Sequence, residues 1–158
     1  MHRPRHAGAA LAALALAAVV RDAQACTTET SIARGRYVVA IAGCNDCHTP
    51  GWGASGGTVP EAQRLVGDRL GWSGPWGTTY ASNLRIVAQR MSERQWVEMA
   101  KTQKFRPPMP WFSLQAMDEA DLRAVYRYIH SLGAAGQAAP AYVPAGRQPD
   151  GPAVRFPE

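Results

Sequence analysis

Apolar residues recur at the spacing of an α-helix in three segments of the chain, and each recurrence predicts one amphipathic helix. The segments cover roughly residues 31–42, 92–106 and 118–132. Each apolar stripe lies on a single helix face, as in a helix with one buried side. The stripes are Gly35, Val38, Val39 and Ala42 in the first helix, Trp96, Met99 and Ala100 in the second, and Leu122, Val125, Tyr126 and Ile129 in the third.

Residues that start or stop helices flank the same segments. Ser31 opens the first helix and Gly43 ends it. Ser92 and Gln95 have the spacing of a capping box at the start of the second helix. The third helix begins at Asp118. The remaining stops are Pro107, Pro108 and Pro110 after the second helix and the C-cap Gly133 after the third.

The rest of the chain shows no strand-like alternation of useful length, so we expect an all-α fold. Residues 49–79 contain eight glycines, three prolines and three tryptophans, which predicts a long loop with a short helix around residues 60–65. Residues 134–158 contain five prolines, seven alanines and three glycines, which predicts an extended tail. A length of 158 residues suits one domain, which we place at residues 26–133.

The N-terminus has the three parts of a secretory signal. Arg3 and Arg5 give a basic start, residues 7–20 form an apolar run, and Ala23-Gln24-Ala25 is a cleavage site of the A-x-A type. Residues 1–25 are therefore predicted to be a signal peptide, and the protein to be periplasmic; a buried alanine-rich helix is the alternative.

Cleavage there would place Cys26 first in the exported chain. Lipidation of Cys26 would attach the protein to a membrane, although Ala23 stands where a lipoprotein signal prefers an aliphatic residue. Membrane contact is expected only through such a lipid or through a membrane-bound partner.

Composition and charge exclude several classes of protein. The chain is 46% apolar, so it can bury a core and is not expected to be disordered. Its formal net charge is +5, but without residues 1–25 it has 14 basic against 11 acidic residues, and no basic cluster with aromatic residues indicates nucleic-acid binding. No apolar run reaches the length of a membrane-spanning helix.

Candidate chemistry is concentrated in the sequence Cys44-Asn45-Asp46-Cys47-His48. A CxxC pair alone fits a redox dithiol, half of a zinc site or a disulfide. Zinc would need further ligands at similar spacing, and a thioredoxin-like dithiol would need a βαβ context, which this strand-poor sequence lacks. With the adjacent histidine, CxxCH is the covalent attachment site of haem c, because two such thiols reach the two vinyl groups of one porphyrin while the imidazole points at the iron.

The other side of the iron needs a second ligand. Met99 lies on an apolar helix stripe and is expected to fill the core. Met109 stands between two prolines, outside any predicted helix, where a stiff segment can hold a thioether at a fixed distance from iron. We therefore favour Met109. The other candidates are Met91 and Met117, which precede helix starts, and His130 late in the third helix.

From about residue 33 to 132 the sequence resembles class I c-type cytochromes, especially the haem subunits or domains that serve periplasmic dehydrogenases. The segments that carry the resemblance are Gly35-Arg36-Tyr37, Cys44 to Thr49, Asn83-Leu84, the helix with Ser92 and Trp96, Pro108-Met109-Pro110, and Asp121 to Ile129.

The resemblance implies an all-α fold in which the N- and C-terminal helices cross near Gly35 and Tyr128, around one covalently bound haem. It implies thioether links to Cys44 and Cys47, with His48 and Met109 as axial ligands. In this family a proline carbonyl usually orients the proximal imidazole, and the candidates here are Pro50, Pro60 and Pro75.

A haem with methionine and histidine ligands has no open axial position, which favours a one-electron carrier with no catalytic residues of its own. Its expected partners are redox proteins such as a periplasmic dehydrogenase, an oxidase or another cytochrome. The alternative is a haem enzyme or a sensor of gas or peroxide with an open axial site.

Further residues are candidates for the surroundings of the haem. Aromatic side chains could exclude water from it, and arginines could pair with its propionates, although core packing and solvated surface positions are the simpler interpretations. The tail could bind a partner or remain free. These candidates are Trp72, Trp76, Trp96, Trp111 and Phe112, then Arg69, Arg85 and Arg106, and, in the tail, Tyr142, Val143 and Phe156.

Overall fold

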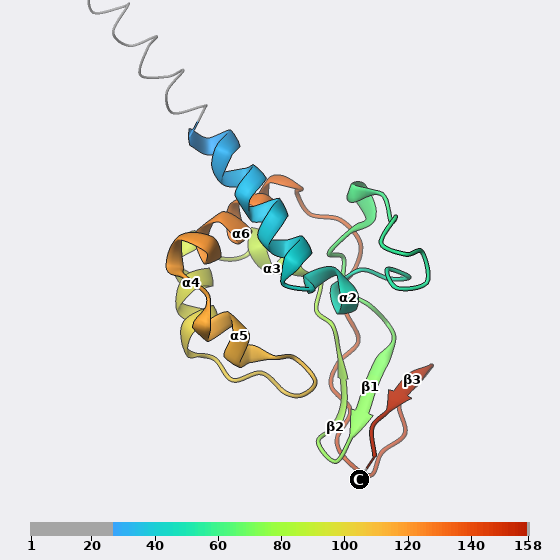
Figure 1. Ribbon diagram of the computed structural model, residues 1–158. Coiled ribbons are helices and arrows are strands. Elements are labelled where there is room, and N and C mark those ends of the chain that lie inside the picture. Colours follow the sequence, from blue (N-terminus) through green and yellow to red (C-terminus); the bar gives the residue numbers. More distant parts are fainter. Residues whose placement is uncertain (1–26, 158) are drawn as a thin grey trace, which may run out of the picture.

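A computed structural model describes residues 27–157 and shows a helical body beside a small sheet (Figure 1). The predicted signal peptide and Cys26 lie outside the described residues. None of the helices described is long and apolar enough to span a membrane. Residues 27–41 are helical, and the further elements are α2 (Cys44–His48), the 3₁₀ helix η1 (Glu61–Gln63), β1 (Gly71–Gly74), β2 (Gly77–Tyr80), α3 (Leu84–Gln89), α4 (Glu93–Thr102), α5 (Trp111–Ala116), α6 (Glu119–Ser131) and β3 (Ala153–Arg155).

The three predicted helices are present, with boundaries that differ by a few residues. The first helix is already formed at residue 27, so Ser31 lies inside it and does not open it. The capping box of α4 is confirmed: the backbone N–H of Ser92 donates to Gln95 Oε1 at 2.8 Å, and Ser92 Oγ accepts from the backbone N–H of Gln95. Helix α4 ends at Thr102, before the prolines are reached, and the left-handed Gly133 (φ +69°) follows α6 as expected.

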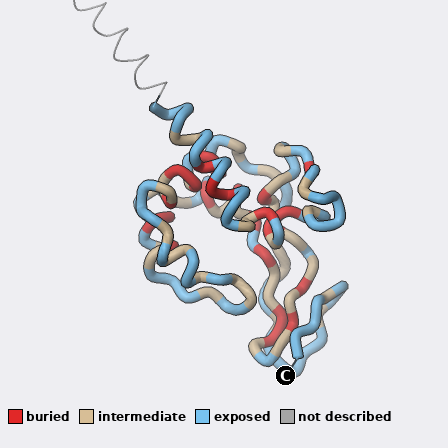
Figure 2. The backbone as a smooth tube through the Cα atoms, viewed as in Figure 1, coloured by how far each residue is buried: buried red, intermediate tan, exposed pale blue. Residues whose placement is uncertain are grey.

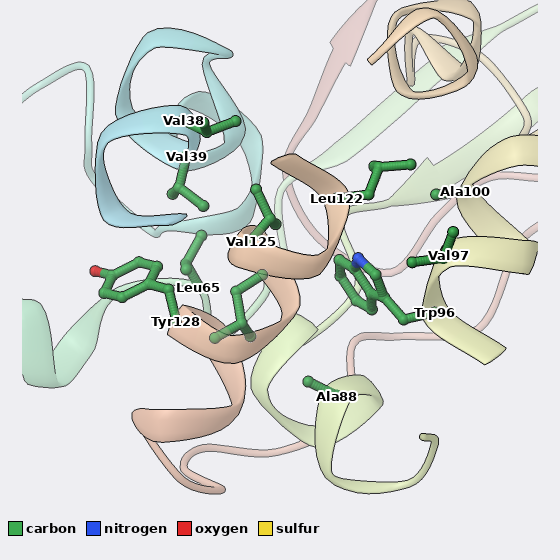
Figure 3. Close-up of a cluster of buried hydrophobic side chains, with 11 residues drawn as sticks. Val38, Val39, Leu65, Ala88, Trp96, Val97, Ala100, Leu122, Val125 and Tyr128 are labelled. Atoms are coloured by element: carbon green, nitrogen blue, oxygen red, sulfur yellow. The ribbon is translucent and has the colours of Figure 1, made fainter. Parts of the chain in front are cut away.

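Helix α6 is the centre of the core, where its side chains meet Val38 and Val39 of the first helix (Figure 3). The first helix crosses α6 at Gly35. A Cβ atom at Gly35 would lie 2.8 Å from Tyr128 Cβ and would overlap the carbonyl group of Ala124, so only glycine allows this approach. The expected crossing near Gly35 and Tyr128 is confirmed. The core residues are Val38, Val39, Leu65, Ala88, Trp96, Val97, Ala100, Leu122, Val125, Tyr128 and Ile129.

The expectation that strands are absent is wrong. Strands β1 and β2 form an antiparallel hairpin, and β3 from the tail pairs in parallel with β1, which gives the order β2-β1-β3. Each strand has only three or four residues, too few to show a period of two in the sequence. The described part of the chain is therefore mostly helical with a small sheet, and the all-α expectation is corrected on this point. The short helix η1 confirms the one expected around residues 60–65.

The tail (residues 134–157) returns along the domain to the sheet, although most of its residues are exposed (Figure 2). Its pairing partners lie more than 60 positions earlier in the chain: Val143 bridges Thr78, and Ala153 is opposite Gly71. The loop predicted for residues 49–79 thus contains both strands that the tail reaches. An extended tail is observed, but it is attached to its own domain.

Glu93 at the start of α4 binds two arginines of α6. It accepts hydrogen bonds from Arg127 Nε at 2.7 Å and from Arg123 Nη1 at 2.9 Å. These bonds, that from Arg127 first, lower the pKa of Glu93. A carboxylate whose pKa is lower in the folded state stabilises the fold above its unfolded pKa and loses that contribution as the pH falls through the folded value.

We therefore expect Glu93→Gln to lower the free energy of unfolding by about 0.5–1 kcal/mol at pH 7, and by less as the pH falls below about 4. Urea denaturation followed by circular dichroism at pH 7, 5 and 3 measures this difference. Glu119→Gln, which removes a more exposed partner of Arg123, is the control and should have a smaller effect. An effect of Glu93→Gln that does not change with pH would contradict the prediction.

Candidate functional site

Both cysteines and the histidine of the CxxCH motif lie on the single short helix α2. The first helix ends at residue 41, and Gly43, with a left-handed backbone (φ +68°), starts α2 in a new direction. Cys44 and Cys47 are half-buried with free thiols, and His48 is buried. The two thiols and the imidazole are thus presented together within five residues.

The His48 imidazole is oriented by a backbone carbonyl that does not belong to a proline. Its Nδ1 atom donates to the carbonyl oxygen of Ser82 at 2.7 Å. The expectation of Pro50, Pro60 or Pro75 in this role is wrong. The acceptor is a main-chain carbonyl, so a residue of any type at this place can accept the bond. With Nδ1 engaged as a donor, the imidazole keeps the lone pair of Nε2, which makes no hydrogen bond to another described residue. Burial lowers the pKa of His48, so the ring is neutral at pH 7, as a metal ligand must be.

Residues 67 and 68 connect the segment that contains Ser82 to α2. The backbone N–H of Gly67 donates to the carbonyl of His48 at 2.9 Å, and that of Asp68 donates to the carbonyl of Ala81 at 3.1 Å. A Cβ atom at Gly67 (φ +78°) would lie 2.9 Å from the carbonyl carbon of Ser82, so a glycine is needed for this approach. Residues 67–68 therefore fix the carbonyl that orients His48.

The environment of the two thiols does not suit the alternative interpretations of the CxxC pair. Burial raises the pKa of Cys44 to about 11 and also raises that of Cys47, so both thiols are protonated at pH 7. Dithiol exchange requires a thiolate, which this burial disfavours. Within residues 27–157 no group of three or more His, Cys, Asp or Glu side chains could hold a metal ion, which leaves a zinc site without its remaining ligands.

The five candidates for a second axial ligand differ in whether they pack against the core. Met91, Met99 and Met117 pack against the hydrophobic core. His130 is exposed and lies next to Tyr126, with ring centroids 5.3 Å apart. Met109 is half-buried in the loop between α4 and α5, outside the core cluster.

The end of β2 and the residues that follow it connect the surroundings of His48 with those of Met109. Thr79 Oγ1 donates to the carbonyl of Pro107, two residues before Met109, at 2.6 Å. Ser82, three residues after Thr79, accepts from His48. Three residues of extended chain span about 10 Å. One short segment therefore supports both of the residues that the sequence predicts as axial ligands.

The aromatic candidates have different surroundings. Trp72 and Trp76 pack against Phe156 of the tail, with centroids 6.1 and 5.3 Å apart. On α5, Trp111 contacts Phe112, which is 61% exposed. Trp96 belongs to the core, and within the described chain its indole Nε1 is buried without an acceptor. An orphaned buried N–H fits a site in which a bound group supplies the missing acceptor.

The arginine candidates are distributed differently from what the sequence indicated. Arg85 is 6% exposed and donates to three backbone carbonyls, those of Ala62, Leu132 and Gly133, so it is neither a solvated residue nor free to bind a propionate. Arg106 stacks on the ring of Tyr142. Arg69 is exposed. The sequence offered no signal for Arg85, because its acceptors are main-chain atoms.

Comparison with known proteins agrees with this geometry. Residues 32–133 match the family model described as Cytochrome c. The chain belongs to the cytochrome c family. No curated protein and no solved structure matches it. Proteins of this family bind covalently attached haem c with its iron, and their haem transfers electrons.

The residues of this cytochrome c fit such a group. The protein offers two thiols and a neutral imidazole on α2, a free Nε2 lone pair on His48 and a buried indole N–H on Trp96 without an acceptor among the described residues. The match ends at residue 133, so the tail that supplies β3 lies beyond the family domain.

Proposed function

We propose that this cytochrome c is a periplasmic one-electron carrier with one haem c, attached through Cys44 and Cys47 and ligated by His48 and Met109, that relays electrons in a respiratory or dehydrogenase-linked chain. The observation that carries the proposal is the CxxCH helix α2, with His48 Nδ1 bound to the Ser82 carbonyl and Nε2 left as a ligand. When bound, haem iron supplies a centre that takes up and releases single electrons.

The protein contributes a fixed ligand geometry to this function. A neutral His48 held by one short hydrogen bond keeps the same orientation in both oxidation states, which limits reorganisation. A thioether from Met109 favours ferrous iron and raises the potential. With both axial positions filled by protein groups, oxygen, peroxide or a substrate finds no open position, which supports a carrier and not an enzyme.

The partners that fit this role are redox proteins: a periplasmic dehydrogenase as donor, and an oxidase or another cytochrome as acceptor. The periplasmic location rests on the signal-like sequence of residues 1–25. Contact with a membrane would come from a lipid on Cys26 or from a membrane-bound partner.

Three measurements on the purified exported protein test the proposal. The red pigment should stay with the protein during acid–acetone extraction, because thioether bonds survive this treatment. The ferric form should show the weak charge-transfer band of methionine-ligated haem, and the ferrous form should not bind carbon monoxide at pH 7. Pigment that washes into the solvent would contradict covalent attachment, and ready binding of carbon monoxide would favour the enzyme or sensor with an open axial site.

A further inference from the structure

The tail over residues 134–157, which we term the strap from here on, contacts residues beside both proposed axial ligands. It follows the family domain in the chain and returns to the sheet through β3 (Figure 1). Its first contact is with Asn83, which is 3% exposed and directly follows Ser82. Asn83 Nδ2 donates to the carbonyls of Ala135, at 2.7 Å, and Gln137. The strap is thus tied to the residue next to the carbonyl that orients His48.

Further along, the strap pairs with the hairpin near the loop that contains Met109. Val143 and Thr78 exchange two backbone hydrogen bonds, of 2.8 and 3.0 Å. The neighbouring Tyr142 donates its phenol hydrogen to the carbonyl of Trp76 at 2.8 Å. These bonds place the Tyr142 ring, and the guanidinium carbon of Arg106 lies 4.0 Å from its centroid. At that distance the cation and the aromatic face attract each other.

The loop before Met109 depends on such side-chain contacts. Among the residues that the structure describes, the backbone N–H groups of residues 104–106 donate no backbone hydrogen bond, and residues 107 and 108 are prolines without an N–H. On the N-terminal side of Met109, the Tyr142 ring stacks on Arg106, and Thr79 Oγ1 donates to the carbonyl of Pro107. On its C-terminal side, the backbone N–H of Trp111 donates to the carbonyl of Met109 at 2.9 Å. The stacking contact comes from the strap.

We propose that the strap braces the methionine loop and that Tyr142 is a positioning residue that keeps Met109 at the iron. This inference rests on the proposed ligation by Met109. Without the Tyr142 ring, the loop has one contact fewer near Met109, and a larger fraction of molecules has an open axial position. A ligand that binds only the open form then binds more tightly, in proportion to that fraction.

The test compares Tyr142→Ala with Phe156→Ala in the haem-loaded protein. Both residues are strap aromatics of equal exposure, 38% and 37%, but Phe156 contacts Trp72 and Trp76 and not the loop. For Tyr142→Ala we expect the ferrous protein to bind carbon monoxide about tenfold more tightly than Phe156→Ala does, which equals about 1.4 kcal/mol. The charge-transfer band should weaken in the same variant. Tyr142→Phe keeps the ring beneath Arg106 and should stay close to wild type.

The rate of trypsin cleavage after Lys104 measures how often the loop opens, and it does not depend on which group binds the iron. It should be several-fold faster in Tyr142→Ala than in Phe156→Ala. Should Tyr142→Ala fail to fold, Arg106→Gln removes the same contact from an exposed position and should have the same effects. Equal carbon monoxide affinity and equal cleavage rates in the two alanine variants would contradict the proposal that the strap holds the methionine loop. If wild type itself lacks the band and binds carbon monoxide, ligation by Met109 fails instead, and cleavage after Lys104 alone decides whether the strap holds the loop.

Discussion

Removal of both thiols, in Cys44→Ala/Cys47→Ala, is expected to abolish covalent haem, and His48→Ala to leave little folded holoprotein. The reason is that the cofactor completes the interior: α2 and the half-buried thiols adjoin the core through Cys44, and a buried N–H on Trp96 has no acceptor among the described residues. Loss of a large apolar group bound at α2 would expose apolar surface to water, and we expect the cost to exceed that of a single core truncation, about 2–5 kcal/mol.

Haem content is measured by haem staining of denatured protein on a gel, and folding by far-ultraviolet circular dichroism. Cys26→Ala replaces the third cysteine of the chain and is the matched control, which should retain haem. Wild-type helicity in the haem-free double variant would show that the polypeptide folds without its cofactor, against this prediction.

Met109→Ala is expected to convert a closed haem centre into an open one. The charge-transfer band of the ferric protein should disappear, and the ferrous protein should bind carbon monoxide, which the wild type is expected to exclude. The potential should fall by on the order of 100 mV, because a soft thioether ligand is replaced by a harder one or by none. Absorption spectra and a redox titration measure these changes.

Met99→Ala is the matched control for this prediction, because Met99 packs against the core. It should keep the band and exclude carbon monoxide while losing about 2 kcal/mol or more of stability. Loss of the band in Met99→Ala together with its retention in Met109→Ala would reassign the ligand. The two variants thus separate a ligand from a core methionine in one experiment.

Local patterns predicted the elements whose signals lie within a few residues of one another. The stripes of the three long helices, the Ser92 capping box and the glycine after the last helix each depend on residues within one or two turns of chain. They are found in the structure, except that Ala42 is exposed and that Leu132 is the C-cap, with Gly133 directly after it. The CxxCH spacing was equally local, and membership of the cytochrome c family supports its interpretation as a haem site. The ligation by Met109 stays a prediction.

Other features could not be predicted because their partners are distant or are main-chain atoms. His48 is oriented by the carbonyl of Ser82, and a residue of any type can supply such a carbonyl. A search for a proline, as the family resemblance implied, therefore led to the wrong residues. Arg85 looked like a surface cation, but its acceptors are three carbonyls brought together by folding. The short helices α3 and α5 have six residues each, too few for a clear stripe.

The amino-acid sequence by itself determined the cofactor chemistry, the three long helices and the order in which they occur, because each depends on residue types at short, fixed spacing. Tertiary structure alone decided which carbonyl orients the imidazole, that the strands exist and that the C-terminal strap returns to them. Those features arise from backbone groups that pair across 82 positions of the chain, from Gly71 to Ala153 for example, and backbone groups are the same in every residue but proline.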